Sequence, residues 1–317
     1  MSSTPYLGGL AARLGGALVR LPRSFRDRES RYLAGAQNPS GGFGGRRGPP
    51  DLYYTSFALR AAQMLDLREA RFWKRAAEFL RKNAPAPAEA ADVLSLLVAR
   101  SILEARGVVL WCETCAAERL AEVRATLERF RSTPAGFART AHAAPSLYHT
   151  FLAALSLELL GEAACARDET VRLVLSREYA HGGFGDMQDA QAGGTNPTAA
   201  AVGLLGILDA LDAAVGARAA AFLLGLQRPD GGFAAHAAAP ASDLMSTFTA
   251  LVALSDMHAA RRARLADAGR FVKALALPGG GFLGTRDDDA PDVEYTFYGL
   301  GTLALLAAEL PEDFARG

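Results

Sequence analysis

Cysteine is scarce in this chain of 317 residues, which contains only Cys112, Cys115 and Cys165. An odd number of cysteines cannot form a fully paired disulfide framework. The stretch from Leu7 to Leu21 is broken by Arg13 and by glycine pairs, so it does not have the pattern of a signal peptide. These features predict a cytoplasmic protein. Cys112 and Cys115 have the spacing of half a zinc site, but no second such pair exists, so we expect two reduced cysteines in an outer loop.

The chain also lacks an excess of either charge and any long apolar run. Its 34 Lys and Arg balance its 34 Asp and Glu, whereas nucleic-acid binding needs a basic surface that displaces counterions. No uncharged apolar run reaches the roughly 20 residues that span a bilayer. Because 50% of the residues are hydrophobic, we expect a globular protein with a large core, buried helices rather than membrane spans, and no nucleic-acid partner.

Two short segments depart from this charge balance. Residues 1–50 contain eight Arg against Asp27 and Glu29, and residues 286–294 contain one Arg against five acids. We expect the basic segment to form a solvated helix face. The alternative is a docking site for an acidic lipid surface, which would place the protein at the periphery of a membrane, or for a second protein subunit.

A unit of glycine, phenylalanine and a following apolar segment recurs along the chain, with its phenylalanine at Phe43, Phe137, Phe184, Phe233 and Phe282. The steps between them are 94, 47, 49 and 49 residues. The first step is close to twice the others, so one eroded copy is expected near residues 84–104, with the segment 92–95 as its candidate. A period of this length indicates six units of one repeat architecture.

Two kinds of predicted helix alternate within these units. The first kind starts at a Thr and is almost free of charge, over residues 55–65, 150–160, 198–208, 247–254 and 296–306. The second kind is charged on one side, over residues 70–81, 118–131, 168–176 and 261–275. Uncharged helices must be buried on every face, and an open row of helix pairs would expose them to water. The sequence therefore predicts an all-α fold, an α/α toroid of six helix pairs whose apolar inner helices surround a central cavity.

We divide the chain into an N-terminal helical extension, residues 1–36, and the toroid, residues 37–317, with a degenerate second repeat and an insertion near residues 105–131. In the extension, leucines from Leu7 to Leu21 recur at spacings of three and four and predict an amphipathic helix that caps the body or lies on a membrane.

The segments between the two kinds of helix have a structural reading. Paired glycines permit positive φ and close backbone approach where an outer helix turns into an inner one. Asp51, Ser146, Asp243 and Asp292 each stand four residues before the Thr of an inner helix. These residue types are preferred N-caps, and each cap stabilises a helix by about 1 kcal/mol.

The repeated unit resembles the prenyltransferase and squalene-oxidocyclase repeat from residue 37 to about residue 309. Residues 37–45, Gln-Asn-Pro-Ser-Gly-Gly-Phe-Gly-Gly, and residues 227–233, Gln-Arg-Pro-Asp-Gly-Gly-Phe, are most similar to the β subunits of protein farnesyl- and geranylgeranyltransferases. This resemblance implies an α/α toroid that binds an isoprenoid or an isoprenoid diphosphate.

The same resemblance implies a zinc site formed by an Asp-x-Cys motif and a His. At these places the chain has Asp243, followed by Met245, and Tyr295. Thioether and neutral phenol are not ligands that zinc prefers, so we expect no zinc and no other cofactor. Where the family has a His, an Arg and a Lys around the diphosphate, the chain offers the segment 193–194 and His236. One histidine is a poor substitute for permanent cations.

The squalene–hopene type cyclases of this superfamily protonate an alkene with an Asp-x-Asp-Asp-Thr motif. The similar segment here is 292–296, which keeps Asp292 and places Glu294 at the second acid. A strong acid of this kind needs two carboxylates with separated pKa values in a dry site. Asp292 and Glu294, together with Asp243, are therefore the candidate catalytic residues. The neighbouring run 287–289 is expected to be a solvated turn.

Aromatic residues gather at the starts of the inner helices and are candidates to line the cavity, where they would suit a long apolar ligand. His149 stands in the third repeat at the position that the zinc-binding His has in the sixth, and we expect it to be a hydrogen-bonded cavity residue. The candidate substrate-binding residues are Tyr53, Tyr54, Tyr148, His149, His236, Phe248, Tyr295 and Tyr298.

Three functions remain open at this level. The first is a protein-prenyltransferase-β-like protein that binds a farnesyl or geranylgeranyl chain, with or without transferring it by a route that does not use zinc. The second is a non-catalytic isoprenoid-binding, lipid-binding or interaction protein. The third is a terpenoid cyclase that uses Asp292 and Glu294 as its acid. A glycosidase ranks last, because no convincing acid pair is present and only two Trp are available for sugar stacking.

Overall fold

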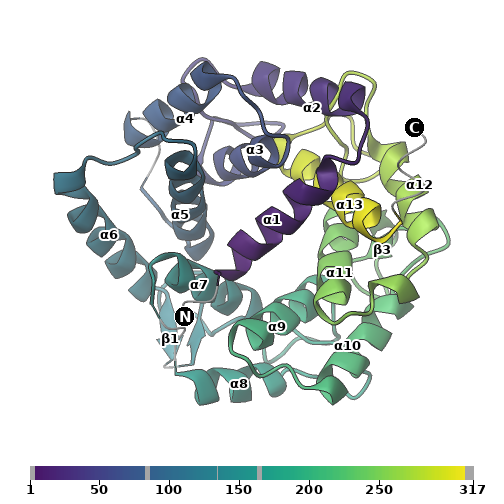
Figure 1. Cartoon of the computed structure of the whole chain (residues 1–317). Coiled ribbons are helices and arrows are strands. Elements are labelled where there is room, and N and C mark those ends of the chain that lie inside the picture. The colour runs from purple at the N-terminus through teal and green to yellow at the C-terminus, as the bar shows by residue number, and fades with distance from the viewer. Residues whose placement is uncertain (1–3, 83–85, 134, 163–165, 311–317) are drawn as a thin grey trace.

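The computed structural model describes residues 4–82, 86–133, 135–162 and 166–310. In these ranges the helices form two concentric layers (Figure 1). The inner layer consists of α3 (Leu52–Met64), α5 (Ala90–Ala105), α7 (Leu147–Leu159), α9 (Thr195–Ile207), α11 (Leu244–Asp256) and α13 (Val293–Glu309). The outer layer consists of α2 (Arg23–Ala36), α4 (Ala70–Lys82), α6 (Glu113–Glu128), α8 (Arg167–Leu175), α10 (Ala213–Gly225) and α12 (Leu265–Leu275).

Each inner helix contacts the next one in the chain, and the last, α13, contacts the first, α3, so the inner layer is a closed ring. The predicted all-α toroid of six helix pairs is confirmed for the described ranges. The division of the chain at residue 36 and the insertion near residues 105–131 stay predictions; α2 and α6, which lie in these segments, both belong to the outer layer.

The eroded second repeat lies where its spacing predicted it. α5 begins at Ala90, and the carboxylate of Asp92 in its first turn accepts hydrogen bonds from the N–H groups of Ala88 (2.9 Å) and Glu89 (3.2 Å). Asp92 thus satisfies backbone donors at a helix start, which otherwise lack partners.

The predicted caps are also present at four other inner helices. Asp51, Ser146, Asp243 and Asp292 each accept a hydrogen bond from the N–H group three residues later, at 2.8, 3.1, 2.7 and 2.9 Å respectively. The inner helices that follow these caps therefore begin at the next residue, three residues before the Thr at which the sequence pattern predicted their start.

The Thr itself has a second role that the sequence pattern did not predict. In five repeats its Oγ1 accepts a hydrogen bond from the N–H of the fully buried phenylalanine in the preceding turn. The pairs are Phe43–Thr55, Phe137–Thr150, Phe184–Thr198, Phe233–Thr247 and Phe282–Thr296, at 3.0, 3.0, 3.0, 2.9 and 3.3 Å. Each turn is thereby fastened to the first turn of its own inner helix.

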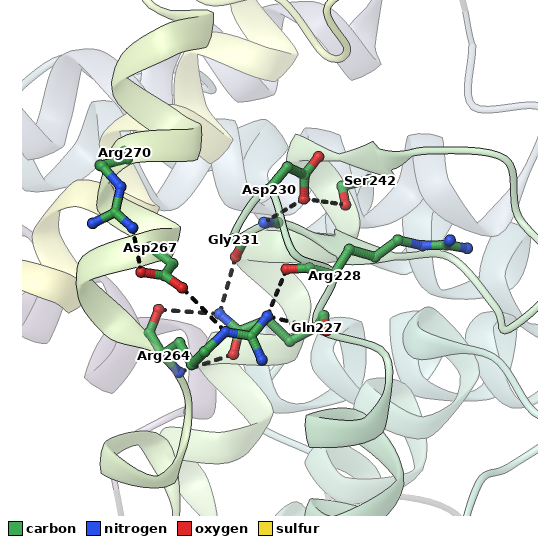
Figure 2. A network of polar contacts seen from close by, with 9 residues as sticks. Gln227, Arg228, Asp230, Gly231, Ser242, Arg264, Asp267 and Arg270 are labelled. Atoms are coloured by element: carbon green, nitrogen blue, oxygen red, sulfur yellow. Dashed lines mark hydrogen bonds and ion pairs between the residues drawn. The ribbon is translucent and has the colours of Figure 1, made fainter.

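The glycine turns also hold neighbouring repeats together. Gly231 has φ +94°, and a Cβ at this position would overlap the backbone carbonyl of Asp267 in α12. Gln227 Nε2 donates to the carbonyls of Gly231 (3.0 Å) and Arg264 (3.1 Å), while Gln227 Oε1 accepts from Arg264 N–H (2.8 Å). Figure 2 shows this network, in which Gln227 joins its own turn to the start of the next outer helix.

The same arrangement occurs in the first repeat, where Gln37 Nε2 donates to the carbonyls of Gly41 and Phe72, both at 3.0 Å. The turns also contain short antiparallel strand pairs, β1 (Arg131–Thr133) with β2 (Gly136–Phe137) and β3 (Phe233–Ala234) with β4 (Ser242–Asp243). A short 3₁₀ helix spans Ala260–Arg262.

The N-terminal helix α1 (Tyr6–Leu18) lies across the ring (Figure 1) and covers the end at which the inner helices finish. The Tyr6 hydroxyl donates to Asp256 Oδ2 at the end of α11 (2.6 Å), and Tyr6 N–H donates to Glu158 Oε2 near the end of α7 (3.2 Å). Leu14 and Leu18 are fully buried. The capping alternative for this helix is therefore the one observed.

None of the helices in the described ranges combines the length and the apolar character needed to cross a membrane.

The Thr–Phe contact gives a direct test of what fastens the repeats. We expect Thr247→Val to lower the free energy of unfolding by about 1–3 kcal/mol, because Phe233 N–H would remain buried without an acceptor. Thr302→Val is the matched control, since the Thr302 hydroxyl only donates to a carbonyl of its own helix (Tyr298, 2.8 Å). Urea unfolding measures both. Equal losses of unfolding free energy in the two variants would show that the Thr–Phe contact stabilises the fold no more than an ordinary hydrogen bond within a helix.

Candidate functional site

The ring encloses a cavity of about 910 Å³. Side chains from all six inner helices and from α1 line it. Seven of the lining residues are aromatic: Tyr6, Phe57, Tyr148, Phe151, Phe248, Phe297 and Tyr298. The inner helices are therefore apolar on two sides, against one another and toward a hollow.

Four of these rings form a continuous band across three inner helices. The ring centroid of Phe57 in α3 lies 5.4 Å from that of Phe297 and 5.3 Å from that of Tyr298 in α13. Phe248 in α11 lies 5.4 Å from each of the same two rings. These separations are typical of stabilising aromatic pairs, so the band is a rigid wall of the cavity.

Three of the eight predicted substrate-binding residues line this cavity: Tyr148, Phe248 and Tyr298. Tyr148 belongs to the first turn of α7, and its side chain is also 38% exposed, which places it at the end of the ring opposite α1. His236 lies in a loop after β3 and is exposed. The remaining four, Tyr53, Tyr54, His149 and Tyr295, are half-buried residues in first turns of inner helices and do not line the cavity.

His149 makes the predicted hydrogen bond but outside the cavity wall. Its Nδ1 lies 2.7 Å from Ser146 Oγ, and burial lowers the pKa of the imidazole. His149 is thus part of the cap of α7.

Asp243, the candidate catalytic acid of the fifth repeat, is fully engaged as a helix cap. Its Oδ1 accepts from Ser246 N–H and its Oδ2 from Ser246 Oγ, both at 2.7 Å. Burial raises the pKa of this carboxyl. Met245 lines the cavity, whereas Tyr295 packs against the guanidinium of Arg46, 5.3 Å from its ring centroid. Asp243, Met245 and Tyr295 therefore do not offer zinc a set of thiolate, imidazole and carboxylate donors.

No group of three or more His, Cys, Asp or Glu residues that could hold a metal ion occurs in the part of the chain that the structure describes. The expectation that the protein binds no zinc stays a prediction.

The other two candidate acids lie where the first and last repeats meet. Asp292 caps α13, and its Oδ2 is 3.3 Å from Arg46 Nε. Glu294 Oε1 accepts a hydrogen bond from the hydroxyl of Tyr53 in α3 (2.6 Å) and one from Tyr298 (3.3 Å). Neither carboxylate lines the cavity. Burial raises the pKa of both carboxyls above their ordinary values.

The acidic run before α13 is not simply a solvated turn. Asp288 accepts two hydrogen bonds from Arg46, both at 2.6 Å, and its Oδ2 also accepts from the N–H groups of Gly284 and Thr285. Arg46 follows α2 and Asp288 precedes α13, so the basic and acidic segments of the sequence meet at the closure of the ring.

Most of the N-terminal arginines likewise have partners within the protein. Six of the eight arginines in residues 1–50 have a hydrogen bond or an ion pair: Arg13, Arg20, Arg23, Arg26, Arg28 and Arg46. Docking of a second subunit or of a membrane surface on this segment stays a prediction.

The expectation of two reduced cysteines is wrong for this structure. Cys112 and Cys115 form a disulfide, with their Cα atoms 5.4 Å apart, a separation typical of such bonds. The two residues are close because Cys112 is the residue that precedes α6 and Cys115 lies in the first turn of this helix. Cys165 lies outside the described residues.

Arg60 is the cavity residue that the sequence patterns missed. It lines the hollow and stacks on the aromatic band, with its guanidinium carbon 5.1 Å from the ring centroid of Phe57 and 5.7 Å from that of Phe297. The signal was available in the sequence, since Arg60 is the one charged residue in the predicted inner helix 55–65.

The buried Glu294 gives a pH test. A pKa raised by burial means that the native state holds this proton more tightly than the unfolded chain, so ionisation at neutral pH destabilises the fold. We expect Glu294→Gln to raise Tm at neutral pH, because the amide oxygen can still accept from Tyr53. The gain should shrink as the pH falls through the ordinary Glu pKa of about 4.3 and disappear below about pH 3.5, where the carboxyl is protonated in both states. A Tm below that of the wild type across the whole pH range, with Asp189→Asn as the exposed control, would contradict this account.

Known proteins share this architecture. The family model for the prenyltransferase alpha-alpha toroid domain matches residues 14–72 and 67–315. No curated protein sequence matches the chain significantly. Among solved structures, Candida albicans protein geranylgeranyltransferase-I complexed with GGPP superposes with a TM-score of 0.68 at 14% identity, over 92% of each chain.

A variant of the type II terpene cyclase MstE from Scytonema, in complex with geranylgeranyl dihydroxybenzoate, superposes with a TM-score of 0.62 at 15% identity, over 95% of this chain and 99% of the cyclase. A glycosidase superposes with a TM-score of 0.59 at 14% identity, over 93% of this chain and 98% of its own. At these identities the structural matches establish the fold alone. The family model, which covers nearly the whole described chain, shows that this protein belongs to the prenyltransferase alpha-alpha toroid family.

Proposed function

We propose that this protein binds an isoprenoid chain of the farnesyl or geranylgeranyl type inside its ring. The observation that carries the proposal is the cavity of about 910 Å³, lined by apolar and aromatic side chains from every inner helix. Ligand cavities measure about 300–1,000 Å³, so the hollow has room for such a chain. Burying the chain would contribute about 0.8 kcal/mol per methylene.

The structural neighbours support an isoprenoid over other apolar ligands. The geranylgeranyltransferase is complexed with GGPP, and the terpene cyclase with geranylgeranyl dihydroxybenzoate. Both ligands carry a geranylgeranyl group. The same fold and a hollow with an aromatic wall make this ligand class the best candidate here.

Binding is better supported than transfer. Asp243 is used as a cap, Met245 and Tyr295 replace the Cys and His that the family resemblance implies, and His236 is exposed. We therefore propose that the protein works without zinc and that any prenyl transfer uses another route. A non-catalytic isoprenoid-binding protein is the simplest form of this proposal.

A terpenoid cyclase is the second candidate, because the aromatic band could stabilise a carbocation. Two observations weaken it. Asp292 and Glu294 are engaged in a cap and in ring closure, and they do not line the cavity. The guanidinium of Arg60 on Phe57 and Phe297 would also repel a positive charge that develops beside these rings.

A blocked cavity tests chain binding. Ala199 in α9 lines the hollow, and we expect Ala199→Trp to weaken the binding of geranylgeraniol at least tenfold, because the indole would occupy the space of the chain. Ala214→Trp, on the exposed face of α10, is the matched control and should bind like the wild type. Quenching of intrinsic fluorescence measures both. Equal affinity of all three proteins would refute the proposal.

Incubation with farnesyl and geranylgeranyl diphosphates separates binding from chemistry. We expect both chains to bind without release of diphosphate. Released diphosphate would indicate transfer or an ionising cyclisation, and a cyclised product that disappears in Asp292→Asn and Glu294→Gln would establish the cyclase instead.

A further inference from the structure

The cavity wall contains an arginine without a counterion. Arg60 has no ion pair and no hydrogen bond to any side chain or backbone group in the described ranges, and its Nε is buried without a partner. The side chain as a whole is half-buried, and removing a cation from water without giving it a partner costs free energy. Stacking on Phe57 and Phe297 recovers only part of this cost. Arg60 thus brings a positive charge to the wall of a largely apolar hollow.

The nearby acids do not neutralise this charge. Asp186 lines the same cavity, but its Oδ1 accepts from the N–H of Tyr148 (2.9 Å) and no ion pair joins it to Arg60. Glu294 accepts from the hydroxyls of Tyr53 and Tyr298. The titratable groups that interact with Arg60 are the phenols of Tyr53, Tyr148 and Tyr298. These phenols are neutral near pH 7 and therefore do not offset its charge.

Arg177 also has a buried Nε without a partner, but it does not line the cavity. Two arginines of the next repeat, by contrast, have acidic partners. Arg100 in the next inner helix lies 2.8 Å from Glu104, one turn along α5, and Arg106 lies 2.9 Å from Asp66. The residues one turn away from Arg60 on α3 are Ser56, Phe57, Gln63 and Met64, and none of them is acidic. The partner of Arg60 is therefore most simply a group that enters the cavity from outside.

We propose that the cavity binds a long-chain monocarboxylate, an isoprenoid or fatty acid, whose carboxylate pairs with the guanidinium of Arg60. This inference deepens the proposed function and rests on it. One guanidinium neutralises one negative charge, and its paired N–H donors match the two oxygens of a carboxylate. A diphosphate would bring at least one further charge into the hollow with no second cation there, at a high desolvation cost.

The rest of the wall suits the chain of such an acid. Arg60 lies in the third turn of α3, and Gln63 and Met64, one turn further, continue the lining toward Leu10 and Leu14 of α1. The aromatic band begins on the other side of Arg60. A chain can thus extend from the carboxylate along apolar surface.

The experiment compares ligands that share one chain and differ in the head group. Binding of geranylgeranoic acid, geranylgeraniol and geranylgeranyl diphosphate is measured by isothermal titration calorimetry on the wild type, Arg60→Met, Arg60→Lys and Arg100→Met. We expect the wild type and Arg100→Met to bind the acid at least tenfold more tightly than the alcohol or the diphosphate. Arg60→Met should lose this preference and keep its affinity for the alcohol, while Arg60→Lys should keep part of it. Palmitic acid distinguishes a fatty from an isoprenoid chain.

The outcomes separate this inference from the proposed function. If the alcohol binds but the wild type shows no preference for the acid, or if Arg60→Met keeps the preference, the Arg60 inference is overturned and chain binding stands. If none of the chains binds to the wild type, the proposed function fails as well. Thermal unfolding gives an independent readout: Arg60→Met should raise Tm, because it removes an unpaired buried charge, whereas a clear fall would show that Arg60 serves the fold.

Discussion

Closure of the ring is the constraint on which the rest of this structure depends. Uncharged helices in an open row would leave one face in water, and only contact between the first and last repeats removes that face. The contact is polar as well as apolar. Glu29 of α2, which is fully buried, accepts from the N–H of Gly281 (2.7 Å), Arg46 pairs with Asp288, and Tyr53 donates to Glu294. Each pair joins residues more than 240 positions apart.

Closure also decides what the buried acids do. At the junction of the repeats Asp292 and Glu294 have helix, arginine and tyrosine partners, so their carboxylates are structural groups with raised pKa values rather than free acids in the hollow. The hollow itself, with α1 across one end, keeps an aromatic wall and the single unpaired guanidinium of Arg60. An unpaired cation in an apolar space is a cost to the fold, and such costs are typical of binding sites.

The architecture could be predicted from the sequence because each repeat is marked by residues that are close together in the chain. Spacing of the turn phenylalanines located the eroded second repeat, and absence of charge marked the inner helices. Asp51 and Asp243 indicated helix starts by residue type alone, because an N-cap side chain bonds to a backbone N–H only three residues later. These features depend on neighbours in the chain, which a reader of the sequence can see.

The site was harder to predict. Whether a residue lines the cavity depends on the face of the helix on which it lies and on partners far away in the chain. Tyr53 and Tyr298 look alike in the sequence, yet only Tyr298 faces the hollow. In the sequence Glu294 looks like a catalytic partner of Asp292, whereas in the structure it accepts a hydrogen bond from the hydroxyl of Tyr53 in α3. Arg60 was one charge in an apolar helix, and only the structure shows that no ion pair joins it to Asp186 in the same cavity. The disulfide between Cys112 and Cys115 followed from the geometry of a helix start.

The most direct test of the central claim is a crystal structure of the protein grown with geranylgeranoic acid. The account predicts a chain inside the ring, between α1 and the aromatic band of Phe57, Phe248, Phe297 and Tyr298, with its carboxylate on Arg60. A hollow filled by repacked side chains, or a ligand bound only outside the ring, would contradict it.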